Sequence, residues 1–198
     1  MSQVGFSLYM EMLDNAVAAL KEGKSLSLSQ VISRQTEIDL RVPALIPEAY
    51  IHDVSLRLSL YKRIASCKNK NQLDDVQIEL IDRFGLLPQA TKNLVHIAKL
   101  KLKAQQIGIS RIEASAAGGS VEFSDNTSVD PMKIITLIQK QPSIYSMSGA
   151  NKLKFARKEV APKNSTTKAV IKEQVTEDFE HETQMRFSLI TNLLNELS

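Results

Sequence analysis

The sequence predicts an α+β fold, with a helical subdomain, short antiparallel strands arranged as hairpins, and an amphipathic helix at the C-terminus. Apolar residues recur with the helical period through the first half of the chain, and after residue 108 the period changes to two, as in strands. The chain has 198 residues, of which 43% are hydrophobic and 24% charged. These values are typical of one globular domain.

The chain should begin with a helix and a strand. A helix is expected over 6–20, where large apolar residues fall on one face. Over 36–42, apolar and charged residues alternate strictly, which predicts a half-buried strand. Pro43 should end this strand, because proline has no N–H to donate to a neighbouring strand.

Three consecutive helices are expected next, over 52–66, 72–84 and 88–108. Asn71 should cap the second of them, because an asparagine side chain accepts a hydrogen bond from a backbone N–H of the first turn. Gly85 should end it. The expected inner faces comprise Leu56, Leu60, Tyr61, Ile64 and Ala65 in the first helix, Leu73, Val76, Leu80 and Phe84 in the second, and Leu94, Ile97, Ala98 and Leu102 in the third.

The second half of the chain should contain most of the strands. The expected elements are a hairpin over 111–123, a helix over 131–138, a second hairpin formed by 144–147 and 152–155, and a helix over 174–197. Gly118 and Gly119 should supply the turn positions of the first hairpin, and Gly149 those of the second. Asp130 and Pro131 are typical of a helix cap and a first helical residue.

Residues 157–172 are polar and basic with almost no large apolar side chains, so they are expected to form a linker. The chain is therefore divided into a domain over 1–156, a linker over 157–172 and an amphipathic helix over 173–198. This helix could pack on its own domain or bind another partner, and the sequence leaves both alternatives open.

Motifs for catalysis or cofactor binding are absent from the sequence. It contains no phosphate-binding loop, no dinucleotide-binding glycine motif and no zinc-hydrolase helix. His52, His96 and His181 fall in different elements, and Cys67 is expected to be a small, buried or half-buried side chain. The sequence thus predicts a chain that is not an enzyme and holds no metal or cofactor.

The location of the protein is expected to be the cytoplasm. No segment resembles a secretory leader or is apolar for long enough to span a membrane. A single cysteine cannot form an internal disulfide, which fits a reducing compartment.

The net charge of +3 includes four blocks that nearly cancel. Residues 92–111 carry five basic residues and no acidic one, and residues 152–172 carry seven basic residues and one acidic one. Residues 71–82 carry four acidic residues, and residues 173–198 carry six acidic residues and one arginine. Charge is therefore more informative by location than by sum.

The acidic residues of the helix expected over 72–84 share one face. At 100° per residue, Asp75, Glu79 and Asp82 lie within about 60° of one another, on the side away from the apolar stripe. Arg83 follows Glu79 by four residues and can pair with it. This face is interpreted either as ordinary solvated surface or as a docking face for a basic partner.

The basic segments give a second hypothesis, that of a small nucleic-acid-binding module. Lys99, Lys101 and Lys103 and the basic linker could contact phosphates, which requires charge but no residues that read bases. Neither segment interleaves aromatic residues, as a platform for stacking single strands would. A solvated helix face and a solvated linker explain the same residues.

Several segments of the chain are distinctive. They are VGFSLYMEMLDNAVAALKEG, LRLSLYKRIA, ELIDRFG with the following LLP, GGSVEF, and LIQKQPSIYSMSGANKLKF. Together they resemble the C-terminal domain of the bacterial transcription-repair coupling factor family. The resemblance covers about residues 4–156, while 157–198 do not align with the family pattern.

This resemblance implies a regulatory role within a longer protein. In that family a DNA translocase motor, which uses ATP and magnesium, precedes this domain, and the whole factor removes stalled RNA polymerase and recruits excision repair. The C-terminal domain is expected to dock on an N-terminal excinuclease-B-like module and to mask the site for excinuclease A, the damage-recognition component. DNA would be contacted by the motor. The resemblance assigns docking to Glu79, Asp82 and Arg83, and Asp75 is added by helix geometry alone.

Overall fold

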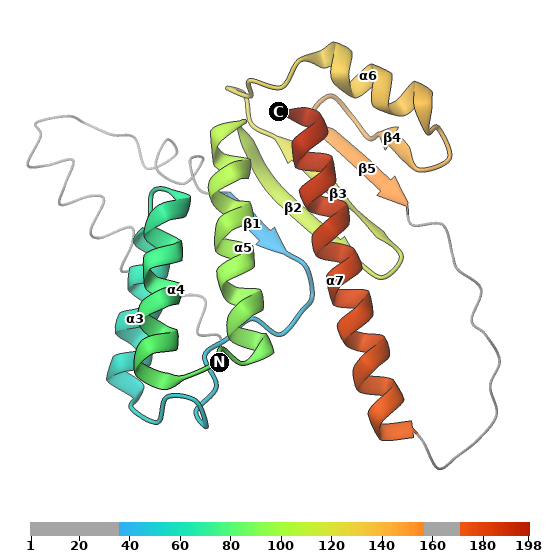
Figure 1. Ribbon diagram of the computed structural model, residues 1–198. Coiled ribbons are helices and arrows are strands. Elements are labelled where there is room, and N and C mark those ends of the chain that lie inside the picture. The colour runs from blue at the N-terminus through green and yellow to red at the C-terminus, as the bar shows by residue number, and fades with distance from the viewer. Residues whose placement is uncertain (1–35, 157–170) are drawn as a thin grey trace, which may run out of the picture.

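The computed structural model describes the backbone of residues 36–156 and 171–198, and the side chains of 36–156 and 179–198 (Figure 1). The helix expected over 6–20 and most of the expected linker lie outside these residues. The elements in chain order are β1 (Glu37–Asp39), α3 (Val54–Ser66), α4 (Lys70–Phe84), α5 (Gln89–Gln106), β2 (Ile109–Ser115), β3 (Gly118–Phe123), α6 (Pro131–Lys140), β4 (Tyr145–Met147), β5 (Lys152–Ala156) and α7 (Ile171–Leu197). The α+β class is confirmed.

The five strands form one mixed sheet in the order β1-β2-β3-β5-β4. The two expected hairpins, β2 with β3 and β4 with β5, are antiparallel, and β3 with β5, a pairing that the sequence did not predict, is antiparallel too. β1 differs, because it pairs parallel with β2 and places Ile38 opposite Ile112. The chain passes through α3, α4 and α5 between these two strands, which provides the long connection that a parallel pair requires.

β1 is shorter than the strand expected over 36–42. Arg41 has a φ of 51°, in the left-handed region, so the extended backbone ends before Pro43 is reached. The alternation itself is confirmed on the inner side, where Leu40 is only 1% exposed. The Thr36 hydroxyl donates to the carbonyl of Ile109 at 2.6 Å and ties the start of β1 to β2.

The first hairpin turns at residues 116 and 117, so the expectation that Gly118 and Gly119 form the turn is wrong. Both glycines lie in β3, where the neighbouring strands approach the backbone closely. A Cβ at Gly119 would lie 2.0 Å from the carbonyl oxygen of Glu113, and one at Gly118 would lie 2.3 Å from that of Phe155. The glycines are required by strand packing.

The second hairpin and the short helix before it match their expected positions. Asp130 caps α6 by accepting a hydrogen bond from the backbone N–H of Met132 at 2.8 Å, and Pro131 is the first helical residue. In the hairpin, Tyr145 pairs with Phe155 across β4 and β5. Gly149 has a φ of 78° in the turn between them.

The helices α3 and α4 are capped at their N-termini by polar side chains. Asp53 accepts from the N–H of Leu56 at 2.9 Å. α4 is capped by Asn69, which accepts from the N–H of Gln72, whereas the expected cap Asn71 lies inside the helix. The helix begins earlier than expected because Asn69 offers the same chemistry one half-turn upstream. Gly85 follows α4 with a φ of 84°, as expected.

Two hydrophobic cores lie on either side of α5. The helical core is formed by Ile46, Ile51, Leu60, Ile64, Leu73, Val76, Leu80 and Leu87. The sheet core includes buried residues from β2, β3, β5, α5, α6 and α7, together with Leu40 just after β1. Ala65, expected on the inner face of α3, is exposed, which corrects that prediction.

α5 packs against both cores, so it has two buried faces and not the single inner face that was expected. Leu94, Ala98 and Leu102 are half-buried against the helical core, while Ile97 packs against the sheet core. Leu100 and Ala104, which the pattern did not select, are buried in the sheet core. Helical periodicity does not single out these two residues, because a helix between two cores has apolar residues around most of its circumference.

α7 packs on the sheet, beside α5 (Figure 1). The sheet core contains Phe187, Ile190, Leu193, Leu194 and Leu197 of this helix. The ring of Phe187 stacks on that of His96 of α5 with centroids 4.2 Å apart, and burial lowers the pKa of His96. Of the two alternatives for the C-terminal helix, the structure shows packing on its own domain. It starts at Ile171, so residues 171 and 172 of the expected linker are helical.

Candidate protein-interaction site

The face predicted for docking lies on α4, which the helical core holds in place. Leu73, Val76 and Leu80 are buried, so the opposite side of the helix points to solvent. Asp75 and Asp82 are exposed there, as is Arg83 at the edge of that face. The structure thus confirms that the acidic residues lie away from the apolar stripe.

Glu79 has internal partners. It accepts a hydrogen bond from Arg63 of α3, and a second from Arg83 at 2.9 Å, which is the expected pair four residues apart. These two hydrogen bonds hold the pKa of Glu79 below its ordinary value, and the bond from Arg63 has the larger effect. Glu79 therefore ties α4 to α3. The sequence pattern did not find Arg63, because the pattern of one helix gives no information on its neighbour.

The remaining charged residues of this face differ in their contacts. Asp75 and Asp82 form no side-chain hydrogen bond or ion pair within the described part of the chain. Asp74, which lies nearer α5, pairs with Lys99 at 2.6 Å, and the hydrogen bond from Lys99 lowers the pKa of Asp74. The guanidinium of Arg83 lies 5.0 Å from the ring centroid of Phe84. Within the described residues, Asp75 and Asp82 are therefore the two carboxylates of this face that have no partner.

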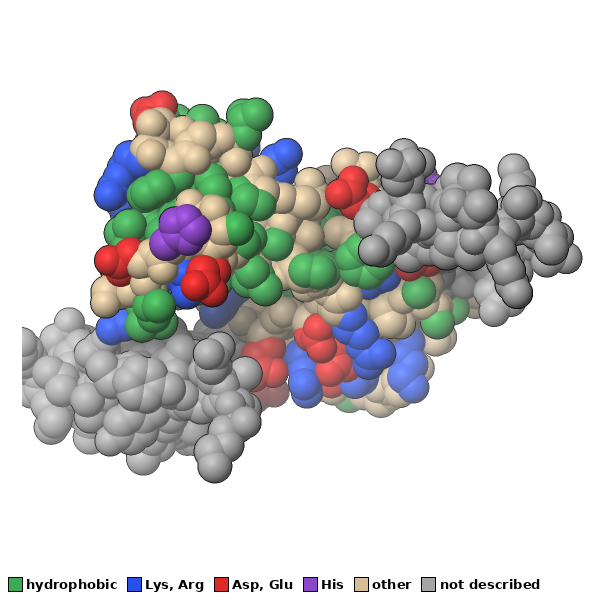
Figure 2. All heavy atoms as spheres, turned by 90° about the horizontal axis from the view of Figure 1, so that it is seen from below, with side chains coloured by type: hydrophobic (Ala, Val, Ile, Leu, Met, Phe, Trp, Pro, Cys, Tyr) green, Lys and Arg blue, Asp and Glu red, His purple; other side chains and the backbone are tan. Residues whose placement is uncertain are grey.

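Three exposed apolar side chains at this site were missed by sequence reasoning. Ile78 is 58%, Ile81 37% and Leu86 87% exposed. The available signal was that Ile78 and Ile81 fall outside the stripe of Leu73, Val76 and Leu80. Viewed from the end where α4 leads into α5, hydrophobic side chains gather over the helical part of the molecule (Figure 2).

The basic residues of 92–111 do not form one surface. Lys99 pairs with Asp74, Lys103 hydrogen-bonds Asn195 of α7, and Arg111 pairs with Glu113 at 3.2 Å on the sheet. Lys101 lies 200° around α5 from Lys99 at 100° per residue. Lys99, Lys103 and Arg111 are thus engaged in contacts within the chain, and Lys101 lies on another side of α5. The described residues therefore do not favour the nucleic-acid hypothesis.

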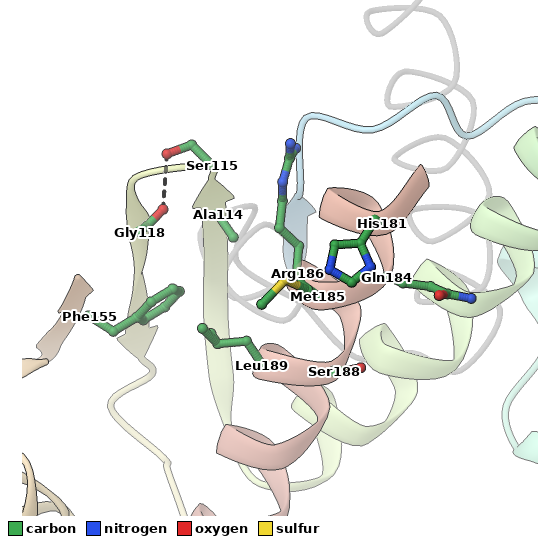
Figure 3. A pocket seen from close by; sticks show the side chains of 10 residues that line it. All are labelled: Ala114, Ser115, Gly118, Phe155, His181, Gln184, Met185, Arg186, Ser188 and Leu189. Carbon is green, nitrogen blue, oxygen red and sulfur yellow. Dashed lines mark hydrogen bonds between the residues drawn. The ribbon is translucent and has the colours of Figure 1, made fainter. Parts of the chain in front are cut away.

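A groove of about 360 Å³ lies between the first hairpin and α7 (Figure 3). Ala114, Phe155 and Leu189 contribute apolar surface to it, and the Ser115 hydroxyl donates to the Gly118 carbonyl. Arg186 is turned toward the strand end of β1, where it donates to the carbonyls of Leu40 and Arg41 at 3.1 Å each. These polar contacts at the groove all go to backbone carbonyls.

The residues considered as metal ligands or nucleophiles lie apart. Among residues 36–156 and 179–198, no three histidine, cysteine or acidic side chains are grouped as a metal site would require. Cys67 is half-buried, as expected, and burial raises the pKa of its thiol. Within the described helices, none has the length and apolar character needed to cross a membrane.

Comparison with known proteins agrees with the fold. Residues 40–134 match the family model of the TRCF domain. The chain is 53% identical over 78% of its length to the transcription-repair-coupling factor of Haemophilus influenzae, and 50% identical over 78% to that of Escherichia coli. It spans only 13% and 14% of the lengths of these two relatives.

A solved structure shares the architecture. The crystal structure of a C-terminal domain of transcription-repair coupling factor superposes with a TM-score of 0.54 at 20% identity, covering 82% of this chain and 94% of that one. Fold and matched sequence together define the chain as a TRCF domain. It belongs to the transcription-repair coupling factor family, of which it represents the C-terminal domain.

Proposed function

We propose that this chain is a non-catalytic, autoinhibitory interaction domain within a longer cytoplasmic coupling factor. In this proposal, α4 docks on the N-terminal excinuclease-B-like module of the same protein and thereby masks the site for excinuclease A. The domain restrains the ATP-dependent motor until RNA polymerase is engaged. ATP, magnesium and DNA are bound by the motor.

The observation that carries this proposal is the outward face of α4. Asp75 and Asp82 have no internal partner among the described residues, although nearby acidic residues do. Charged groups at an interface contribute mainly to specificity and to the rate of association. A contact that must open and close suits such a surface, because exposed ion pairs are individually weak and screened by salt.

The direct test of docking is a charge reversal at Asp82. Asp82→Lys should raise the dissociation constant for the separate N-terminal module roughly 10-fold or more, because it replaces an attraction to a basic surface by a repulsion. The measurement is isothermal titration calorimetry, with the fold checked by circular dichroism. Asp82 has no internal hydrogen bond or ion pair within the ranges that the structure describes, so the domain should remain folded.

A matched control is available on another face of the molecule. Asp125 is also exposed and lies in the loop between β3 and α6. Asp125→Lys makes the same change in net charge and should leave the affinity unchanged apart from a small general effect. If Asp82→Lys binds as tightly as the Asp125→Lys control, docking through α4 is refuted.

A further inference from the structure

The exposed face of α4 alternates acidic and apolar side chains. Asp75, Ile78 and Asp82 follow at intervals of three and four residues, so they form one column along the helix. Ile78 is 58% exposed, between the two carboxylates in this column. Ile81 lies one helical step to the side, toward α5, and Leu86 follows directly after the helix has ended at Gly85. The column therefore has an apolar middle.

These apolar side chains are not part of the helical core. That core takes Leu73, Val76 and Leu80 from α4, whereas Ile78 and Ile81 face outward. Leu86 is 87% exposed although its neighbour Leu87 is buried. Single exposed apolar residues are common, but an apolar patch bordered by polar residues is typical of a protein-interaction site, and these three side chains lie beside two carboxylates that have no partner among the described residues.

The charges of this surface limit what can cover it. Two copies of the chain facing each other here would bring Asp75 and Asp82 of both copies together, which is unfavourable. Phosphate groups of nucleic acid or of an acidic membrane would be repelled in the same way. A protein surface with an apolar depression bordered by arginine or lysine fits both the apolar and the acidic side chains.

We infer that the docking site on α4 is bipartite. Ile78, Ile81 and Leu86 are buried by the partner and supply most of the affinity, while Asp75 and Asp82 pair with basic groups around them and set orientation and association rate. Glu79 is a positioning residue, because its carboxylate is held by Arg63 and Arg83. This inference rests on the proposed docking function, and its occupant is the N-terminal module.

The test separates apolar from charged contributions by binding kinetics. The variants are Ile78→Ser, Leu86→Ser and Asp82→Lys, measured against the immobilised N-terminal module at several salt concentrations. Ile78→Ser and Leu86→Ser should each raise the dissociation constant roughly 10-fold through faster dissociation, with the salt dependence retained. Asp82→Lys should mainly slow association and alter the salt dependence.

The control for the apolar variants is Leu58→Ser. Leu58 lies on α3 and is 57% exposed, which matches the exposure of Ile78, and it has no place in the proposed site. The Leu58→Ser variant should bind the N-terminal module as tightly as the unaltered chain does. The inference is overturned if Ile78→Ser and Leu86→Ser bind within about twofold of this control while Asp82→Lys binds weakly. In that case docking stands and only its apolar part fails. If Asp82→Lys also binds normally, the proposed function itself fails.

Discussion

A full-length coupling factor with Asp82→Lys should hydrolyse ATP faster in the absence of DNA than the unaltered factor. If the closed, docked state is favoured by about 3 kcal/mol, it is occupied about 99% of the time. A 10-fold loss of docking affinity, as expected for Asp82→Lys, removes about 1.4 kcal/mol of that preference and raises the open fraction from about 1% to about 6%. The share of molecules in which the motor is unrestrained would then rise roughly 10-fold.

The measurement is the steady-state rate of ATP hydrolysis without DNA, together with capture of excinuclease A. Both should rise together, because in the proposed function one docked state restrains the motor and masks the site for excinuclease A. The same factor with Asp125→Lys should behave like the unaltered one, since Asp125 lies in the loop between β3 and α6. An unaltered rate and unaltered capture in the Asp82→Lys factor would contradict the regulatory role.

The second large effect concerns the sheet. Gly119→Ala should lower the free energy of unfolding by at least about 3 kcal/mol, because the added methyl group would overpack a backbone contact. Its Cβ would lie 2.0 Å from the carbonyl oxygen of Glu113 and 2.6 Å from Cζ of Phe155. Backbone cannot withdraw as a flexible side chain can, so β2 and β3 would have to separate. Thermal and urea denaturation, followed by circular dichroism, would measure the loss.

Gly149→Ala is the control for this prediction. Gly149 has a φ of 78°, but a Cβ there would have no atom within 4 Å. The substitution should therefore cost only about 1 kcal/mol, from backbone conformation. Equal stability losses in the two variants would show that close approach of the strands at Gly119 is not what requires a glycine.

Much of the fold could be predicted from periodicity, because most elements have one buried face. Periodicity predicts the stripe of Leu73, Val76 and Leu80, and the chemistry of capping predicts Asp130 at the start of α6. α5 was described incompletely, because cores on both sides leave no single apolar face. The pairing of β1 with β2 could not be predicted, because the register between strands distant in sequence depends on the path of the chain.

The candidate site could be predicted only in part. Helix geometry placed Asp75, Glu79 and Asp82 on one face, and the structure agrees. It could not show that Glu79 is paired with Arg63, since that contact joins two helices. Nor could it show that Leu86 is exposed while Leu87 is buried, because the turn after Gly85 decides which of the two leucines points inward.

Chemical-shift mapping would show directly whether the partner docks on α4. The isotope-labelled 198-residue chain would be titrated with the unlabelled N-terminal module while its backbone amide signals are followed. Perturbed signals should cluster over 75–86, while those of β4, β5 and α6 should stay in place. Perturbations confined to α7, to the groove beside it or to the basic residues of α5, with 75–86 unchanged, would contradict docking on α4.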